Sequence, residues 1–209
     1  MILSKQLKGW DIESTGNGNK VEFTRFPEGL VVVRLVDTVP NMRWTHWINS
    51  ARASVNCPGK GCPICNIRKQ QKANKEPQSP MGRRLSLQVI NRNTGKLEIL
   101  EQGITFFEDL KIVLQMAVEQ DLDIDGVDLN IRRKGLGKDD TSYRIDLGEK
   151  YPMTEEDLKL IEEDKIELNE YFKPNTPEQI VRILNGESFS EVMKESYESE
   201  DEEDEIVLE

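Results

Sequence analysis

The sequence contains no long apolar run, few cysteines and a single histidine, and each shortage excludes a class of protein. No segment approaches the roughly 20 apolar residues of a membrane-spanning helix. The stretch MILSKQLKGWDIEST lacks the apolar core and cleavage site of a secretory peptide. Three cysteines cannot all pair with one another, which argues against an extracellular disulfide framework. We therefore expect a soluble cytoplasmic protein, in the host cytoplasm if it is viral, without a membrane partner.

Charge is distributed unevenly along the 209 residues, whose formal net charge is -11. Residues 20–96 hold fourteen Lys and Arg against four acidic residues, a local balance of +10. The last fifteen residues, ESYESEDEEDEIVLE, carry nine carboxylates and no base. A basic half of this kind attracts polyanions in spite of the acidic total.

Alternating and helical patterns predict short strands around one central helix. KVEFTRFPEGLVVVRLVDT indicates a first hairpin that turns at residues 27–29, and RRLSLQVINRNTGKLEILEQ indicates a second. Segments 127–133 and 142–147 are two further strands. An amphipathic helix is predicted between these pairs, with an apolar face made of Phe106, Leu110, Val113, Leu114 and Ala117.

These elements are typical of a mainly β (α+β) fold with peripheral helices, and an OB-type Greek-key barrel fits them best. We expect an N-terminal arm at residues 1–19 and a core at 20–150, with a zinc-binding insertion at about 41–83. A helical extension follows at 151–194, where Thr residues precede acidic first turns. Residues 195–209 have the composition of a disordered acidic tail.

The only histidine and all three cysteines lie in one short stretch, HWINSARASVNCPGKGCPIC. One nitrogen and three sulfur ligands, from His46, Cys57, Cys62 and Cys65, make a set that tetrahedral zinc prefers. A closed set without an open position or a nearby base indicates one structural Zn²⁺ and no catalysis. A redox C-x-x-C pair would need a βαβ pattern around it, which the sequence lacks.

Basic residues interleaved with aromatic residues suggest single-stranded nucleic acid, because an aromatic ring can stack on any unpaired base. The candidate DNA contacts are Arg34, Arg43, Trp44, Trp47, Arg83, Arg84, Arg92, Arg132, Lys134, Tyr143 and Arg144. Each of them taken singly could instead be a core or a solvated side chain.

Five features follow one another along the chain: VVVRLVDTVP, His46, Cys57, CPICNIRK and LSLQVINRNTGKLEILEQGITFFEDL. In this order the chain resembles the single-stranded-DNA-binding replication proteins of tailed bacteriophages. The resemblance covers roughly residues 20–150, and the tail is similar in character. It implies an OB-fold core with an inserted zinc subdomain whose ligands fall on the same four residues. It also implies strand coating in DNA replication, recombination and repair, with a basic aromatic cleft for the strand. Family members bind cooperatively through a basic N-terminal arm, whereas residues 1–19 are only lightly basic, so self-association along DNA stays open.

The acidic tail predicts two roles, competition with DNA for the basic cleft and recruitment of partners. Candidate partners are replication proteins such as a polymerase, a helicase or a helicase loader. The recruiting residues are Glu200, Asp201, Glu202, Glu203, Asp204, Glu205, Ile206, Val207 and Leu208.

Two alternatives remain on sequence grounds. The chain could be a zinc-stabilised protein-interaction module or a transcription accessory factor that binds no single strand. It could also be a nuclease that holds metal through Asp121, Asp123 and Asp125, although DLDIDGVDLN is more typical of a polar loop. We expect no enzymatic activity.

Overall fold

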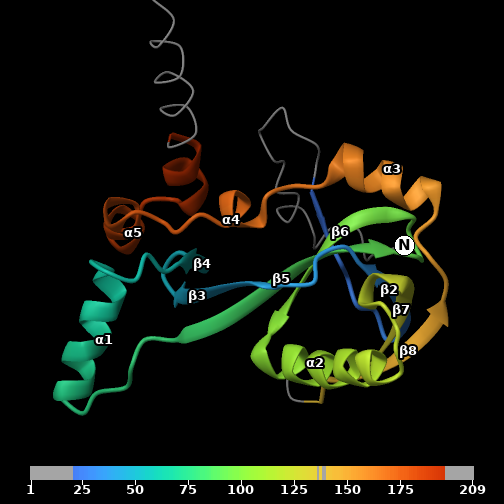
Figure 1. The fold of residues 1–209 in the computed structure, drawn as a ribbon. Helices are drawn as coiled ribbons and strands as arrows, with labels where there is room; N and C mark the ends of the chain where they lie inside the picture. The colour runs from blue at the N-terminus through green and yellow to red at the C-terminus, as the bar shows by residue number, and fades with distance from the viewer. Residues whose placement is uncertain (1–20, 136, 138–139, 196–209) are drawn as a thin grey trace, which may run out of the picture.

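A computed structural model describes residues 21–135, 137 and 140–195, so the predicted N-terminal arm and, apart from Glu195, the predicted acidic tail lie outside the described residues. The described part holds eight strands, five labelled α-helices, one short 3-10 helix and a further helical segment at residues 189–195 (Figure 1). The strands are β1 (Glu22–Phe23), β2 (Gly29–Leu35), β3 (Asn41–Ile48), β4 (Ala53–Asn56), β5 (Met81–Asn91), β6 (Lys96–Gly103), β7 (Val127–Lys134) and β8 (Ser142–Lys150). The helices are α1 (Pro63–Ala73), α2 (Ile104–Glu119), α3 (Glu155–Asp164), α4 (Leu168–Tyr171) and α5 (Pro177–Leu184), with η1 at Ile124–Gly126.

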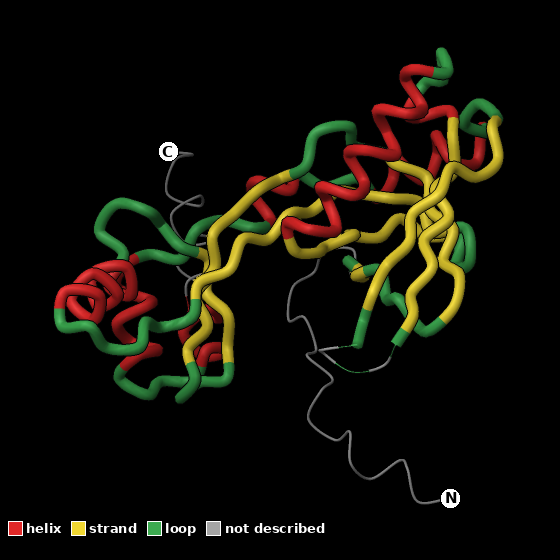
Figure 2. The backbone as a smooth tube through the Cα atoms, turned by 90° about the horizontal axis from the view of Figure 1, so that it is seen from below, coloured by secondary structure: helices red, strands yellow, loops and turns green. Residues whose placement is uncertain are grey.

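Strand β5 connects the two halves of the molecule. Its first residues pair with β3, its last residues pair with β2, and β6 runs antiparallel along most of its length. Figure 2 shows the result, in which long strands join a lobe that carries α1 to a lobe that carries α2. The predicted second hairpin is confirmed as β5 and β6, and Gly95 at the turn has a φ of 69° that favours glycine.

The mainly β fold with peripheral helices is confirmed, but the sheet is not closed into a barrel. The main strand order is β1-β6-β5-β2-β7-β8, and within the described residues the end strands β1 and β8 do not pair with each other. The predicted first hairpin is also wrong, because β1 pairs in parallel with β6 while β2 lies between β5 and β7. With only two residues, β1 is too short to bridge the remaining gap.

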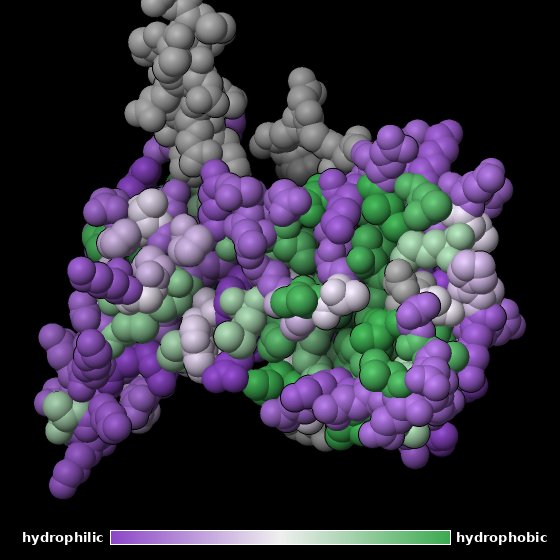
Figure 3. Space-filling view, in the orientation of Figure 1, coloured by the Kyte–Doolittle hydropathy of each residue, from purple (hydrophilic) through white to green (hydrophobic). Residues whose placement is uncertain are grey.

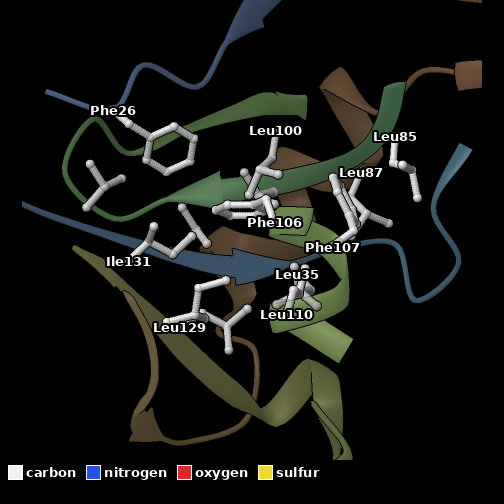
Figure 4. Close-up of a cluster of buried hydrophobic side chains, with 14 residues drawn as sticks. Phe26, Leu35, Leu85, Leu87, Leu100, Phe106, Phe107, Leu110, Leu129 and Ile131 are labelled. Carbon is white, nitrogen blue, oxygen red and sulfur yellow. The ribbon is translucent and has the colours of Figure 1, made fainter. Parts of the chain in front are cut away.

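The main hydrophobic core lies between the sheet and α2 (Figure 4). Phe106, Phe107, Leu110 and Ala117 are the buried residues of α2, and the first three pack on strand residues such as Leu87. The predicted apolar helix face is therefore confirmed at Phe106, Leu110 and Ala117, with Val113 and Leu114 partly buried. Helix α2 thus covers one side of the sheet, where it contacts β5, β6 and β8.

The chain after β8 crosses the other side of the sheet and is tied to it by polar contacts. Arg92, the residue that follows β5, forms an ion pair with Asp157 of α3. The capping box of Thr154 and Asp157 starts that helix. The side-chain amide of Gln88 donates a hydrogen bond to the carbonyl of Ile166 at 2.9 Å, and its side-chain oxygen accepts one from the Ile166 amide at 2.8 Å. Arg43 stacks on the ring of Phe172, 3.4 Å from its centroid. We call residues 151–195 the C-terminal extension.

Candidate metal centre and nucleic-acid interface

The structure brings His46, Cys57, Cys62 and Cys65 together, and their ligand atoms all lie within 4.8 Å of one another. The sulfur atoms of Cys57 and Cys65 are 3.6 Å apart, and Nε2 of His46 lies 3.3 Å from the Cys65 sulfur. A tetrahedral zinc ion with zinc–sulfur bonds of about 2.3 Å would separate its ligands by about 3.8 Å. The four side chains therefore suit one metal ion without a large rearrangement.

Local sequence explains how the ligands converge. His46 comes from β3, Cys57 follows β4, and Cys62 and Cys65 begin α1. Gly59 and Gly61 have φ values of 73° and 81°, a conformation that other residues rarely adopt, and they fold the loop back between Cys57 and Cys62. The Gly59 amide donates to the Cys57 sulfur at 3.3 Å, and Pro63 stands in the first turn of α1.

The pKa shifts of His46, Cys57 and Cys65 also fit a site that binds a cation. Burial, and then the positive charge of Arg68, lower the pKa of His46, which favours the neutral imidazole that binds metals. Burial raises the pKa of the Cys57 thiol and raises the pKa of Cys65 to about 12. The Cys57 and Cys65 thiols therefore favour the protonated form unless a positive ion compensates for the thiolate charge.

Strand β3 divides the predicted aromatic contacts between two faces of the sheet. Side chains alternate along a strand, so Trp44 shares a face with His46, whereas Trp47 lies on the face of Arg43. Trp44 is 41% exposed and stands opposite Arg83, whose guanidinium lies 4.5 Å from the indole centroid. We call the side of β3 and β5 that carries Trp44 and Arg83 the Trp44 face, and the opposite side, where Phe172 of the C-terminal extension stacks on Arg43, the covered face. At the end of β3 the Trp44 face also meets the extension, because Ile48 packs in one hydrophobic cluster with Ile180 and Ile183.

Three predicted DNA contacts are instead engaged inside the protein. Arg34 is fully buried, and its Nε donates to Asp128 at 2.7 Å. Arg92 is held by Asp157 and Asp128. Arg43 bonds Ser86 and Glu101 beneath Phe172. The function of these arginines in this structure is to tie the sheet to the C-terminal extension, and we leave them out of the interface.

The other predicted contacts gather mainly at the β7–β8 hairpin. Arg132, Lys134 and Arg144 are exposed, and they line a hollow of about 360 Å³ together with Gly29, Arg133, Ser142 and Tyr143. The Tyr143 ring is half-buried, edge-on against Phe26 and Phe106, so its contribution is mainly to packing. Arg84 is exposed on the covered face, directly opposite Arg43.

Helix α1 adds basic residues that the list of predicted contacts omitted. Lys69 and Lys72 are exposed on α1, and Lys60 and Lys75 are exposed just outside it. The charge run NIRKQQKANK was the available signal for them. His46 on the Trp44 face lies against Cys65 of α1, so the start of this basic helix is on the same side of the sheet as Trp44.

Charge distinguishes the two faces further. Residues 151–194 of the extension hold eleven acidic and five basic residues, which disfavours a polyanion on the covered face. The segment 57–76 next to the Trp44 face holds five basic residues and one acidic residue. Figure 3 shows the lobe of α1 as mainly hydrophilic, with a notch between it and the lobe of α2.

The rival nuclease site involves Asp125, whose side chain lies outside the part that the structure describes. Among the residues that the structure describes, the Cys and His cluster is the one group of three or more side chains that could hold a metal ion. No helix in the described part of the chain is long and apolar enough to cross a membrane.

Comparison with known proteins gives one distant relative. A protein of Escherichia phage T5 named "Probable ssDNA-binding protein" is 27% identical over 158 residues, which cover 66% of this chain and 59% of that protein. The match thus spans about three fifths of the relative. No family model matches the chain, and no solved structure matches it.

Proposed function

We propose that this protein binds single-stranded DNA without sequence preference through the Trp44 face, and that it performs no chemical step. The observation that carries the proposal is the exposed Trp44 ring with the Arg83 guanidinium 4.5 Å from its centroid, on the side of β3 opposite the one where Phe172 stacks on Arg43. An unpaired base can stack on the indole while the arginine neutralises a phosphate. The distant phage relative, named for the same activity, supports this choice of ligand.

The strand path that best fits the charges runs from α1, across Trp44 and Arg83, toward the basic hollow of the β7–β8 hairpin. Exposed lysines of α1 and the side chains of Arg132, Lys134 and Arg144 supply positive charge at the two ends. Phosphate neutralisation releases condensed counterions, which makes affinity strongly dependent on salt. Because bound bases stack on protein, duplex DNA is disfavoured and exposed strands are protected during replication, recombination and repair.

The metal in this proposal is one structural Zn²⁺ bound by His46, Cys57, Cys62 and Cys65. When bound, the ion neutralises thiolate charge and fixes the start of α1 against β3. The acidic tail, including residues 200–208, competes with DNA for the basic residues and recruits replication proteins in the host cytoplasm. Self-association along the strand would depend on residues 1–19.

Fluorescence anisotropy with a labelled oligo(dT) tests the proposal. For the zinc-loaded full-length chain we expect the logarithm of the binding constant to fall linearly with the logarithm of salt concentration, by about 0.7 for each phosphate contacted on a single strand. Duplex DNA of equal length should bind at least roughly tenfold more weakly, because its bases cannot reach Trp44. Absence of oligo(dT) binding at low salt would overturn the proposal and favour a zinc-stabilised protein-interaction module.

A further inference from the structure

We propose that the zinc centre and the C-terminal helices form one coupled folding unit, so that the metal keeps residues 168–195 docked and those residues in turn strengthen metal binding. This inference rests on the proposed zinc site and is independent of DNA binding. It gives the metal a function beyond the local stability of its own loop.

Apolar packing is the first support. A second hydrophobic cluster, which shares no residue with the main core, contains the ligand Cys62 and α1 residue Ile64 together with Ile180 and Ile183 of α5. Ile180 and Ile183 are fully buried. The cluster also includes Val192, from the helical residues 189–195 that follow α5. Helix α5 and the helical residues 189–195 thus bury apolar side chains on the metal-binding segment and not on the main core.

Backbone hydrogen bonds at the first cysteine ligand are the second support. Asn56 immediately precedes Cys57, and its amide donates to the side-chain oxygen of Asn175 at 2.7 Å. The Asn175 amide donates to the Asn56 carbonyl at 3.0 Å in return. The Asn56 side chain donates to the carbonyls of Phe172 and Lys173 at 3.4 and 3.2 Å. This network joins the extension to the chain one residue before a metal ligand.

The ligand loop itself also lies against α5. A side-chain carbon placed on Gly61 would be 3.7 Å from Cγ of Pro177, the first residue of α5. The loop conformation that gathers Cys57 and Cys62 is therefore the one that α5 contacts. If the loop spreads when the metal leaves, Cys62 and Ile64 withdraw from Ile180 and Ile183, and α5 loses its packing partner.

Thermodynamic linkage makes the coupling reciprocal. A ligand that binds only the docked form stabilises docking, and any change that weakens docking must weaken metal binding by the same factor. The main core, built by α2 and the sheet, has its own hydrophobic cluster and should keep its structure when the metal is removed. Metal loss would thus release residues 168–195 from the metal-binding segment, while the sheet remains folded.

The test compares zinc affinity in two variants of one helix, in the full-length chain. Zinc content is measured first, and competition with a colorimetric chelator then gives the dissociation constant. Ile183→Ala, at a fully buried position, should weaken zinc binding roughly tenfold, within the usual range of about 5–150-fold for coupled sites. Val181→Ala, at a position 43% exposed on the same helix, should change it less than about twofold.

A second readout covers the case in which Ile183→Ala fails to fold. Chelation of the wild-type chain should open residues 168–195 to limited proteolysis before any cleavage in β5 to β8, and Asn175→Ala should weaken zinc binding in the same direction as Ile183→Ala. Equal zinc affinities of the wild type and both docking variants, or unchanged proteolysis after chelation, would overturn the coupling. A chain that holds no zinc would overturn it together with the proposed metal site, while leaving the oligo(dT) result unaffected.

Discussion

Replacing Asp128 by alanine is expected to lower the free energy of unfolding by about 3–5 kcal/mol, the range for breaking one side of a buried ion pair. Asp128 accepts hydrogen bonds from the fully buried Arg34 at 2.7 Å and from the Tyr151 hydroxyl at 2.8 Å. It also pairs with Arg92 at 3.3 Å. Its removal leaves the Arg34 charge buried without its carboxylate. Urea denaturation, followed by circular dichroism, measures the loss.

Asp146→Ala is the matched control for that result. Asp146 pairs with Arg144 at 2.9 Å, but the two side chains are 39% and 77% exposed. Exposed ion pairs contribute only about 0–1 kcal/mol, so this variant should unfold at nearly the wild-type urea concentration. Equal losses in both variants would show that the Arg34 and Asp128 pair does not hold β2 to β7 as the structure indicates.

Replacing Trp44 by alanine is expected to weaken oligo(dT) binding by about 1–3 kcal/mol, which corresponds to roughly 5–150-fold in the dissociation constant. The indole is exposed, and its ring is the stacking surface on the Trp44 face. Anisotropy titrations at fixed salt measure the effect. The fold should survive, because Trp44 belongs to neither hydrophobic cluster.

Trp47→Ala controls for the loss of an exposed tryptophan from the same strand. Trp47 is 44% exposed, close to the 41% of Trp44, but alternation along β3 places it on the covered face. We expect less than about a twofold change in affinity, since no base should stack there. A larger loss for Trp47→Ala than for Trp44→Ala would move the strand to the opposite face.

Features that depend on short sequence segments were the ones that the sequence predicted well. The turn residues between Asn91 and Lys96 specify the β5–β6 hairpin, and the spacing of Phe106, Leu110 and Ala117 specifies α2. The short spacing of Cys57, Cys62 and Cys65 limits how far apart these ligands can lie. His46 joins them because β3 and β4 are neighbours in both the sequence and the sheet.

Features set by distant partners could not be predicted in the same way. Whether β1 pairs with β2 or with β6 is decided by tertiary contacts, such as those of Phe23 with Tyr171 and Phe172 in the extension. The partners of arginine side chains were also unpredictable, because nothing near Arg34 in the sequence indicates that it will be buried in an ion pair with Asp128. The sequence therefore could not show which of the predicted DNA contacts, such as Arg34 and Arg92, would form ion pairs within the protein.

The most direct test of the account is the fluorescence of Trp44 itself. A chain with Trp10 and Trp47 replaced by phenylalanine keeps Trp44 as its only tryptophan, and titration with oligo(dT) reports whether bases reach that ring. The account predicts strong quenching that salt reverses, and little quenching in the companion chain that keeps only Trp47. Oligo(dT) binding without quenching of Trp44 would contradict the claim that single-stranded DNA lies on the Trp44 face.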